Sequence, residues 1–65
     1  MEKLTEKEIE ILDRKISEEK RDVVKNAVEE AYRQYFNSIN NNLGINPKAL
    51  HIIRYYIENN ELPVF

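Results

Sequence analysis

The chain contains no cysteine and only one glycine among its 65 residues. Without cysteine, neither a disulfide framework nor a thiolate metal site can stabilise it. One glycine is too few for a glycine-rich phosphate-binding loop. A chain of this length buries only about 60% of the surface that its unfolded form exposes. We therefore expect a single domain over residues 1–65, with a thin core that self-association or a partner protein stabilises further.

Long apolar runs and an excess of positive charge are also missing. The longest apolar run is far below the roughly 18 residues that span a bilayer, which excludes a membrane-spanning role. The N-terminal stretch "MEKLTEKEIE" has no apolar signal region, so we expect a cytoplasmic protein. The net charge of −2 has the wrong sign for a protein whose affinity comes from neutralising phosphates. Nucleic-acid binding would therefore require a local basic patch.

What the chain does contain is a set of helix start signals. Thr5 and Glu8 have the spacing of a capping box, which predicts a helix over about residues 5–16. Asn46 is a favourable N-cap residue and is followed directly by proline, which favours the first helical position. These two residues predict a helix over about residues 47–59.

A third helix is predicted between these two, over about residues 18–39. This stretch has neither glycine nor proline, and its apolar residues recur at the spacing of one helical face. They are Val24, Val28, Ala31, Tyr35 and Ile39. The sequence thus predicts an all-α fold, a small three-helix domain.

No glycine or proline marks a boundary between the first two predicted helices. The apolar face of residues 5–16 is turned by roughly 100° from that of residues 18–39, more than the drift of a straight helix. Ser17, followed by two glutamates, has the pattern of an N-cap with acids in the first turn. We expect a break or sharp bend at about residues 17–21. The alternative is one long, bent helix that pairs with a second chain.

The middle helix carries an unusually wide apolar arc of around 200°, against the roughly 100° of a helix that packs on one side only. Such a helix needs neighbours on two sides, and its aromatic residues are of the type enriched at protein interfaces. We therefore expect a helical dimer. The partner-binding residues predicted from this arc and from the C-terminus are Tyr32, Tyr35, Phe36, Ile39 and Phe65.

Residues 60–65 form an apolar C-terminal tail. Pro63 disfavours helical conformation at Leu62, so the chain turns away from the last helix. Leu62, Val64 and Phe65 then either fold back over the first and third helices or dock on another molecule.

The last helix presents a basic outward face on the helical wheel, while its apolar residues fill the other side. The residues of this face that could contact nucleic acid are Lys48, His51, Arg54 and Tyr55. Glu58 shares the face, and the connection before this helix is longer than the tight turn of a helix-turn-helix motif. Nucleic-acid binding is therefore considered but not favoured.

Catalytic chemistry has little support in the composition. One histidine, two serines and no cysteine are too few for a convincing nucleophile or acid/base pair, and no histidine lies near the acidic clusters. We expect no enzyme activity, cofactor or metal. The leading hypothesis is a small non-enzymatic regulator or adaptor that binds protein as a homodimer or in a heteromeric complex. The alternative is a DNA-binding transcriptional regulator that uses residues 46–59 as its contact helix.

Overall fold

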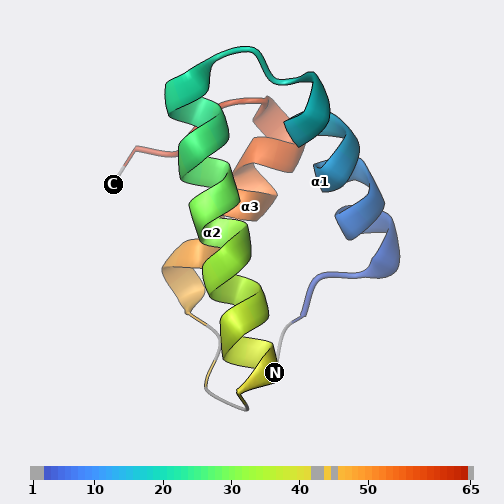
Figure 1. The fold of residues 1–65 in the computed structure, drawn as a ribbon, viewed down its shortest axis with the longest axis vertical. Coiled ribbons are helices and arrows are strands. Elements are labelled where there is room, and N and C mark those ends of the chain that lie inside the picture. The colour runs from blue at the N-terminus through green and yellow to red at the C-terminus, as the bar shows by residue number, and fades with distance from the viewer. Residues whose placement is uncertain (1–2, 42–43, 45, 65) are drawn as a thin grey trace.

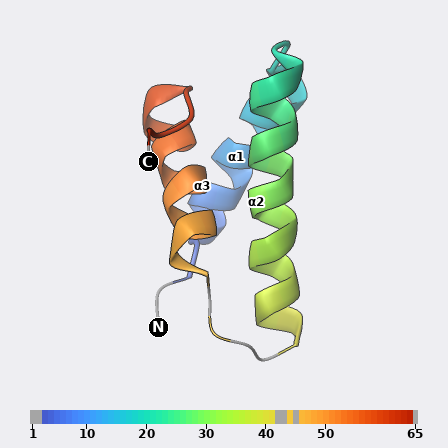
Figure 2. The ribbon, with the colours of Figure 1, turned by 90° about the vertical axis from the view of Figure 1, so that its left-hand side faces the viewer.

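The computed structural model describes residues 3–41, 44 and 46–64. This part of the chain forms three helices, α1 (Glu6–Glu18), α2 (Asp22–Asn40) and α3 (Pro47–Asn59), and no strand. In Figure 1, α2 stands in front of α3, and α1 lies to one side; Figure 2 shows α3 beside α2 from the edge. None of these helices combines the length and the apolar character needed to cross a membrane. The predicted all-α, three-helix fold is confirmed.

Both predicted helix starts are present. The backbone N–H of Glu8 donates to the Thr5 hydroxyl at 3.1 Å, and the Thr5 N–H donates to the Glu8 carboxylate at 2.9 Å. The N–H of Lys48 donates to the side chain of Asn46 at 3.0 Å. Each bond pairs a backbone N–H that the helix itself cannot satisfy.

The boundary between α1 and α2 differs in detail from the prediction. The predicted break is confirmed, because residues 19–21 are not helical and α1 and α2 are two separate helices rather than one bent helix. However, α2 begins at Asp22 instead of residue 18. The prediction that Ser17 caps the second helix is wrong, because Ser17 lies inside α1 and its hydroxyl donates to the Arg14 carbonyl at 3.0 Å. Arg21 occupies the N-cap position of α2 without a side-chain capping bond.

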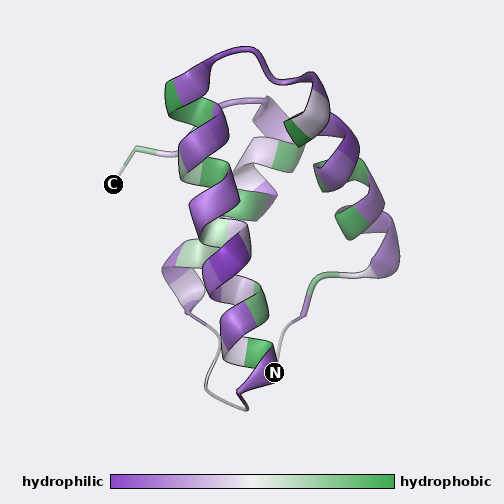
Figure 3. Cartoon of the chain, viewed as in Figure 1, coloured by the Kyte–Doolittle hydropathy of each residue, from purple (hydrophilic) through white to green (hydrophobic). Residues whose placement is uncertain are grey.

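The core is built from one face of each helix together with the segment that precedes α1. Its members are Leu4, Leu12, Val28, Ala31, Tyr35, Ala49, Leu50, Ile53 and Tyr56. α3 packs most extensively against α2, and α1 contacts both less closely. Figure 3 shows hydrophobic and hydrophilic bands alternating along α1 and α2, with a hydrophilic connection between them. This pattern is that of amphipathic helices that bury one stripe each.

The C-terminal segment folds back only in part. Asn60 ends α3 in the left-handed conformation (φ 57°), which asparagine tolerates better than most residues. Leu62 packs against the core and Pro63 is buried, whereas Val64 is 97% exposed. Phe65 lies outside the described residues, so the predicted role of the tail in binding a partner stays a prediction.

Candidate functional site

A groove runs between α1 and α2, which meet at their connection and diverge along their lengths in Figure 1. It encloses a hollow of about 470 Å³. The residues that line it are Asp13, Ile16 and Ser17 of α1 and Lys25, Glu29, Tyr32, Arg33 and Phe36 of α2. Apolar side chains and charged side chains both reach this groove, as in surfaces that bind proteins.

The apolar part of the groove consists of Ile16, Tyr32 and Phe36. The ring of Phe36 is in contact with that of Tyr32, at a centroid distance of 4.8 Å, and Phe36 remains 41% exposed. The ring of Phe36 also lies edge-on to the buried ring of Tyr35, at a centroid distance of 5.9 Å. The three aromatic rings therefore form a continuous row, in which Phe36 lies between Tyr35 and Tyr32.

Asp13 of α1 faces Tyr32 of α2 across the groove. Partial burial raises the pKa of the Tyr32 hydroxyl, and the neighbouring Asp13 carboxylate raises this pKa further through its charge and a hydrogen bond. The hydroxyl therefore stays protonated. The aromatic ring of Tyr32 lines the groove and offers apolar surface to a bound molecule.

The α2 side of the groove carries charges of alternating sign. Lys25, Glu29 and Arg33 follow one another at four-residue intervals, so they lie one helical turn apart. Arg33 makes an ion pair with Glu30 on its own helix, in which the two side chains are 74% and 54% exposed. An ion pair this exposed contributes little stability, so Arg33 can exchange Glu30 for another acidic group at small cost.

The predicted partner-binding residues are separated by the structure into different environments. Tyr32 and Phe36 line the groove. Ile39 is half-buried against the core. Tyr35 lies inside the core, 2% exposed, and so offers no surface to a partner. Phe65 lies outside the described residues.

The basic face of α3 is partly engaged with the rest of the chain. Arg54 donates to the Glu8 carboxylate at 3.2 Å and to the Lys3 carbonyl at 3.4 Å, which ties α3 to the start of α1. The pKa of Glu8 is lowered, first by the hydrogen bond from the Thr5 backbone and then by Arg54. The rings of His51 and Tyr55 are 6.0 Å apart, edge to face. Arg54 thus has a structural role on this face.

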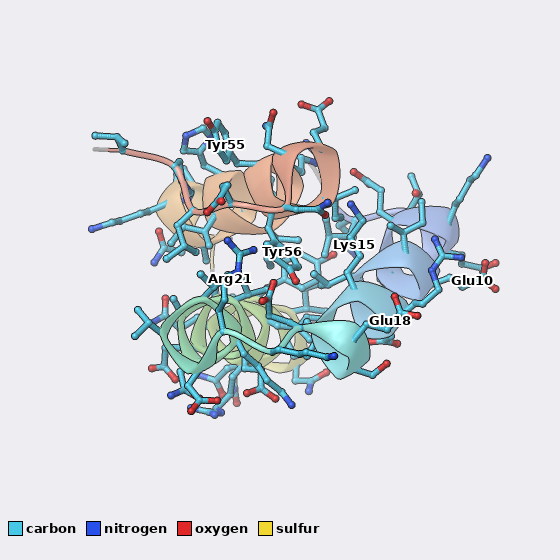
Figure 4. All side chains as sticks on the ribbon, turned by 90° about the horizontal axis from the view of Figure 1, so that it is seen from above. Glu10, Lys15, Glu18, Arg21, Tyr55 and Tyr56 are labelled. Atoms are coloured by element: carbon cyan, nitrogen blue, oxygen red, sulfur yellow. The ribbon has the colours of Figure 1, made fainter. Side chains whose placement is uncertain are left out.

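A polar network at the other end of the molecule was not predicted. Tyr56 donates to the Glu19 carboxylate at 2.8 Å, and the same carboxylate accepts from the Arg21 guanidinium at 2.9 Å. Arg21 also binds Glu61 at 2.8 Å. Figure 4 shows Lys15, Arg21 and Tyr56 converging between the helices. These bonds hold the connection between α1 and α2 against the end of α3.

The Glu19 carboxylate is the most perturbed acidic group of this network. Its side chain is only 8% exposed. Hydrogen bonds, first those from Arg21 and then the one from Tyr56, lower the pKa of Glu19 from 4.5 to about 2. Burial, and after it the hydrogen bond to Glu19, raises the pKa of Tyr56 to about 12. Every charged group here has a partner from the same chain, so we assign the network a structural role.

No known protein family, characterised protein or solved structure matches this chain. Within residues 3–41, 44 and 46–64, no three histidine or acidic side chains are grouped closely enough to hold a metal ion. The groove between α1 and α2 is therefore the strongest candidate site, because it combines exposed aromatic surface with ordered charges.

Proposed function

We propose that this protein is a small non-enzymatic regulator or adaptor that acts by binding protein through the groove between α1 and α2. The observation that carries this proposal is the exposed ring of Phe36, which lies against Tyr32 and is flanked by charged side chains. Aromatic anchors in a pocket with a polar rim supply most of the binding energy in many protein interfaces. An amphipathic helix in a groove between helices is a common form of such recognition.

DNA binding through α3 has weaker support. Only Lys48 and Arg54 are firm cations on the outward face of this helix, and Arg54 binds Glu8 and the Lys3 carbonyl. A protein that relies on phosphate contacts needs several cations directed at the nucleic acid.

Affinity capture from the native cell tests the proposal with matched variants. Phe36→Gln removes the exposed ring from the groove. Val23→Gln makes a similar apolar-to-polar change at a residue of α2 that is 77% exposed and outside the groove lining. We expect the wild type and Val23→Gln to capture the same protein, and Phe36→Gln to lose it while its helical content, measured by circular dichroism, is unchanged.

Two results would contradict the proposal. The first is that Phe36→Gln still captures the same protein as the wild type. The other is binding of the wild type to random duplex DNA with an affinity that falls steeply with salt, because this dependence reports phosphate neutralisation.

A further inference from the structure

The charge order along α2 restricts what can occupy the groove. Lys25, Glu29 and Arg33 give the sequence positive, negative, positive at one-turn intervals. A parallel second copy of α2 would place each charge against the same charge. An antiparallel copy centred on Glu29 would place Glu29 against Glu29, and Lys25 against Arg33. Both arrangements are repulsive.

An antiparallel copy centred midway between Glu29 and Arg33 behaves differently. Glu29 of each chain then lies opposite Arg33 of the other, so one twofold axis creates two identical ion pairs. Glu29 and Arg33 are therefore complementary to their own copy in this register, and Lys25 lies opposite the partner's Asn37. Twofold pairing of this kind is the commonest closed arrangement of soluble homo-oligomers.

We propose that the occupant of the groove is α2 of a second copy of this chain, antiparallel, with Glu29 opposite the partner's Arg33. This inference rests on the proposed function and names its partner. The Glu30 ion pair of Arg33 is exchanged for the intermolecular pair, since both its side chains are more than half exposed. The charge pairs set register and orientation, while burial of Tyr32 and Phe36 supplies the affinity.

The aromatic residues exclude the remaining attractive register. A register with Lys25 opposite the partner's Glu29 would also give two ion pairs. In that register the twofold axis passes at the level of Ala27. Phe36 would then lie opposite Glu18, which belongs to α1 and not to α2. In the proposed register Phe36 lies opposite Asn26, inside α2, so the partner helix covers its ring.

A charge-exchange experiment tests the proposal. Glu29→Arg places arginine opposite arginine, and Arg33→Glu places glutamate opposite glutamate. We expect each variant alone to dimerise about tenfold or more weakly than the wild type. An equal mixture of the two variants should restore the dimer, because both pairs are then opposite in charge. Sedimentation equilibrium at about 100 μM measures the mass. Glu58→Arg, on the exposed face of α3, is the control that should dimerise normally.

Three outcomes would overturn the inference, and the first of them requires no variant. A wild type that is monomeric at about 100 μM excludes the second copy. A mixture that stays monomeric while both variants keep their helical content excludes the ion pairs. A dimer that forms when Glu29→Arg is mixed with Lys25→Glu, but not when it is mixed with Arg33→Glu, shows that Glu29 lies opposite the partner's Lys25 instead. If the wild type is monomeric but Phe36→Gln still abolishes capture from the cell, the proposed function stands with another partner.

Discussion

The hydroxyl of Tyr35 accepts a hydrogen bond from the backbone N–H of Leu4 at 2.7 Å, across 31 residues of sequence. Both residues are buried. The bond holds the segment before α1 against the middle of α2, and it satisfies a backbone donor that water cannot reach. The helix next to the groove is thus anchored to the N-terminal segment by one side chain.

Tyr35→Phe should destabilise the protein by about 1–3 kcal/mol, because the Leu4 N–H is left buried and unpaired. Urea unfolding measures this change. Tyr55→Phe makes the same substitution on the half-buried outward side of α3 and should leave the unfolding midpoint nearly unchanged. Equal stability of Tyr35→Phe and the wild type would show that the bond contributes nothing.

Glu19 makes stability depend on acid pH. Its pKa is about 2 in the folded protein, below the ordinary value of 4.5. The stabilisation from this depressed pKa is therefore complete above about pH 4.5, and it is lost as the pH falls towards 2. Glu19→Gln should flatten this part of the curve when thermal unfolding is measured between pH 2 and 7. A Glu19→Gln curve with the wild-type slope would contradict the assignment.

The two N-cap residues each stabilise one helix start. Thr5→Ala should cost about 0.5–2 kcal/mol, and Asn46→Ala a similar amount, since each leaves a backbone N–H without its side-chain partner. Differential scanning calorimetry should show a lower melting temperature for both variants. Partner binding should weaken only to the extent that the lower stability reduces the fraction of folded protein.

Ile53 is fully buried at the centre of the α3 contact with the core. Ile53→Ala should cost about 2–5 kcal/mol, because it leaves a cavity in a closely packed site. In a domain of this size that cost can unfold the protein. Val64→Ala, at a residue that is 97% exposed, should have no measurable effect on urea unfolding.

The helix starts could be predicted because their signals are local. The capping bonds of Thr5 and Asn46 join residues two or three positions apart, so the sequence pattern contains both partners. The start of α2 has no such signal. Arg21 is held there by Glu19 and by Glu61, which lies 40 residues further along the chain. That contact forms only once α3 has packed.

The groove was only partly predictable for a related reason. The apolar arc of α2 contains Tyr32, Tyr35 and Phe36 without indicating which of them face the core. The positions of α1 and of the segment around Leu4 decide which rings face the core. They bury Tyr35 and leave Phe36 exposed. Asp13 was not predicted either, because its contact with Tyr32 joins two different helices.

Site-specific photo-crosslinking in the native cell tests the binding role of the groove most directly. A photoreactive phenylalanine analogue replaces Phe36 in one variant and Val23 in a control variant, and the mass of the adduct is measured. We predict an adduct from position 36, at about twice the 7.8 kDa of the chain, and none from position 23. An adduct of another mass from position 36 would retain the groove as a binding site but exclude the second copy. An adduct from position 23 with none from position 36 would contradict the groove itself.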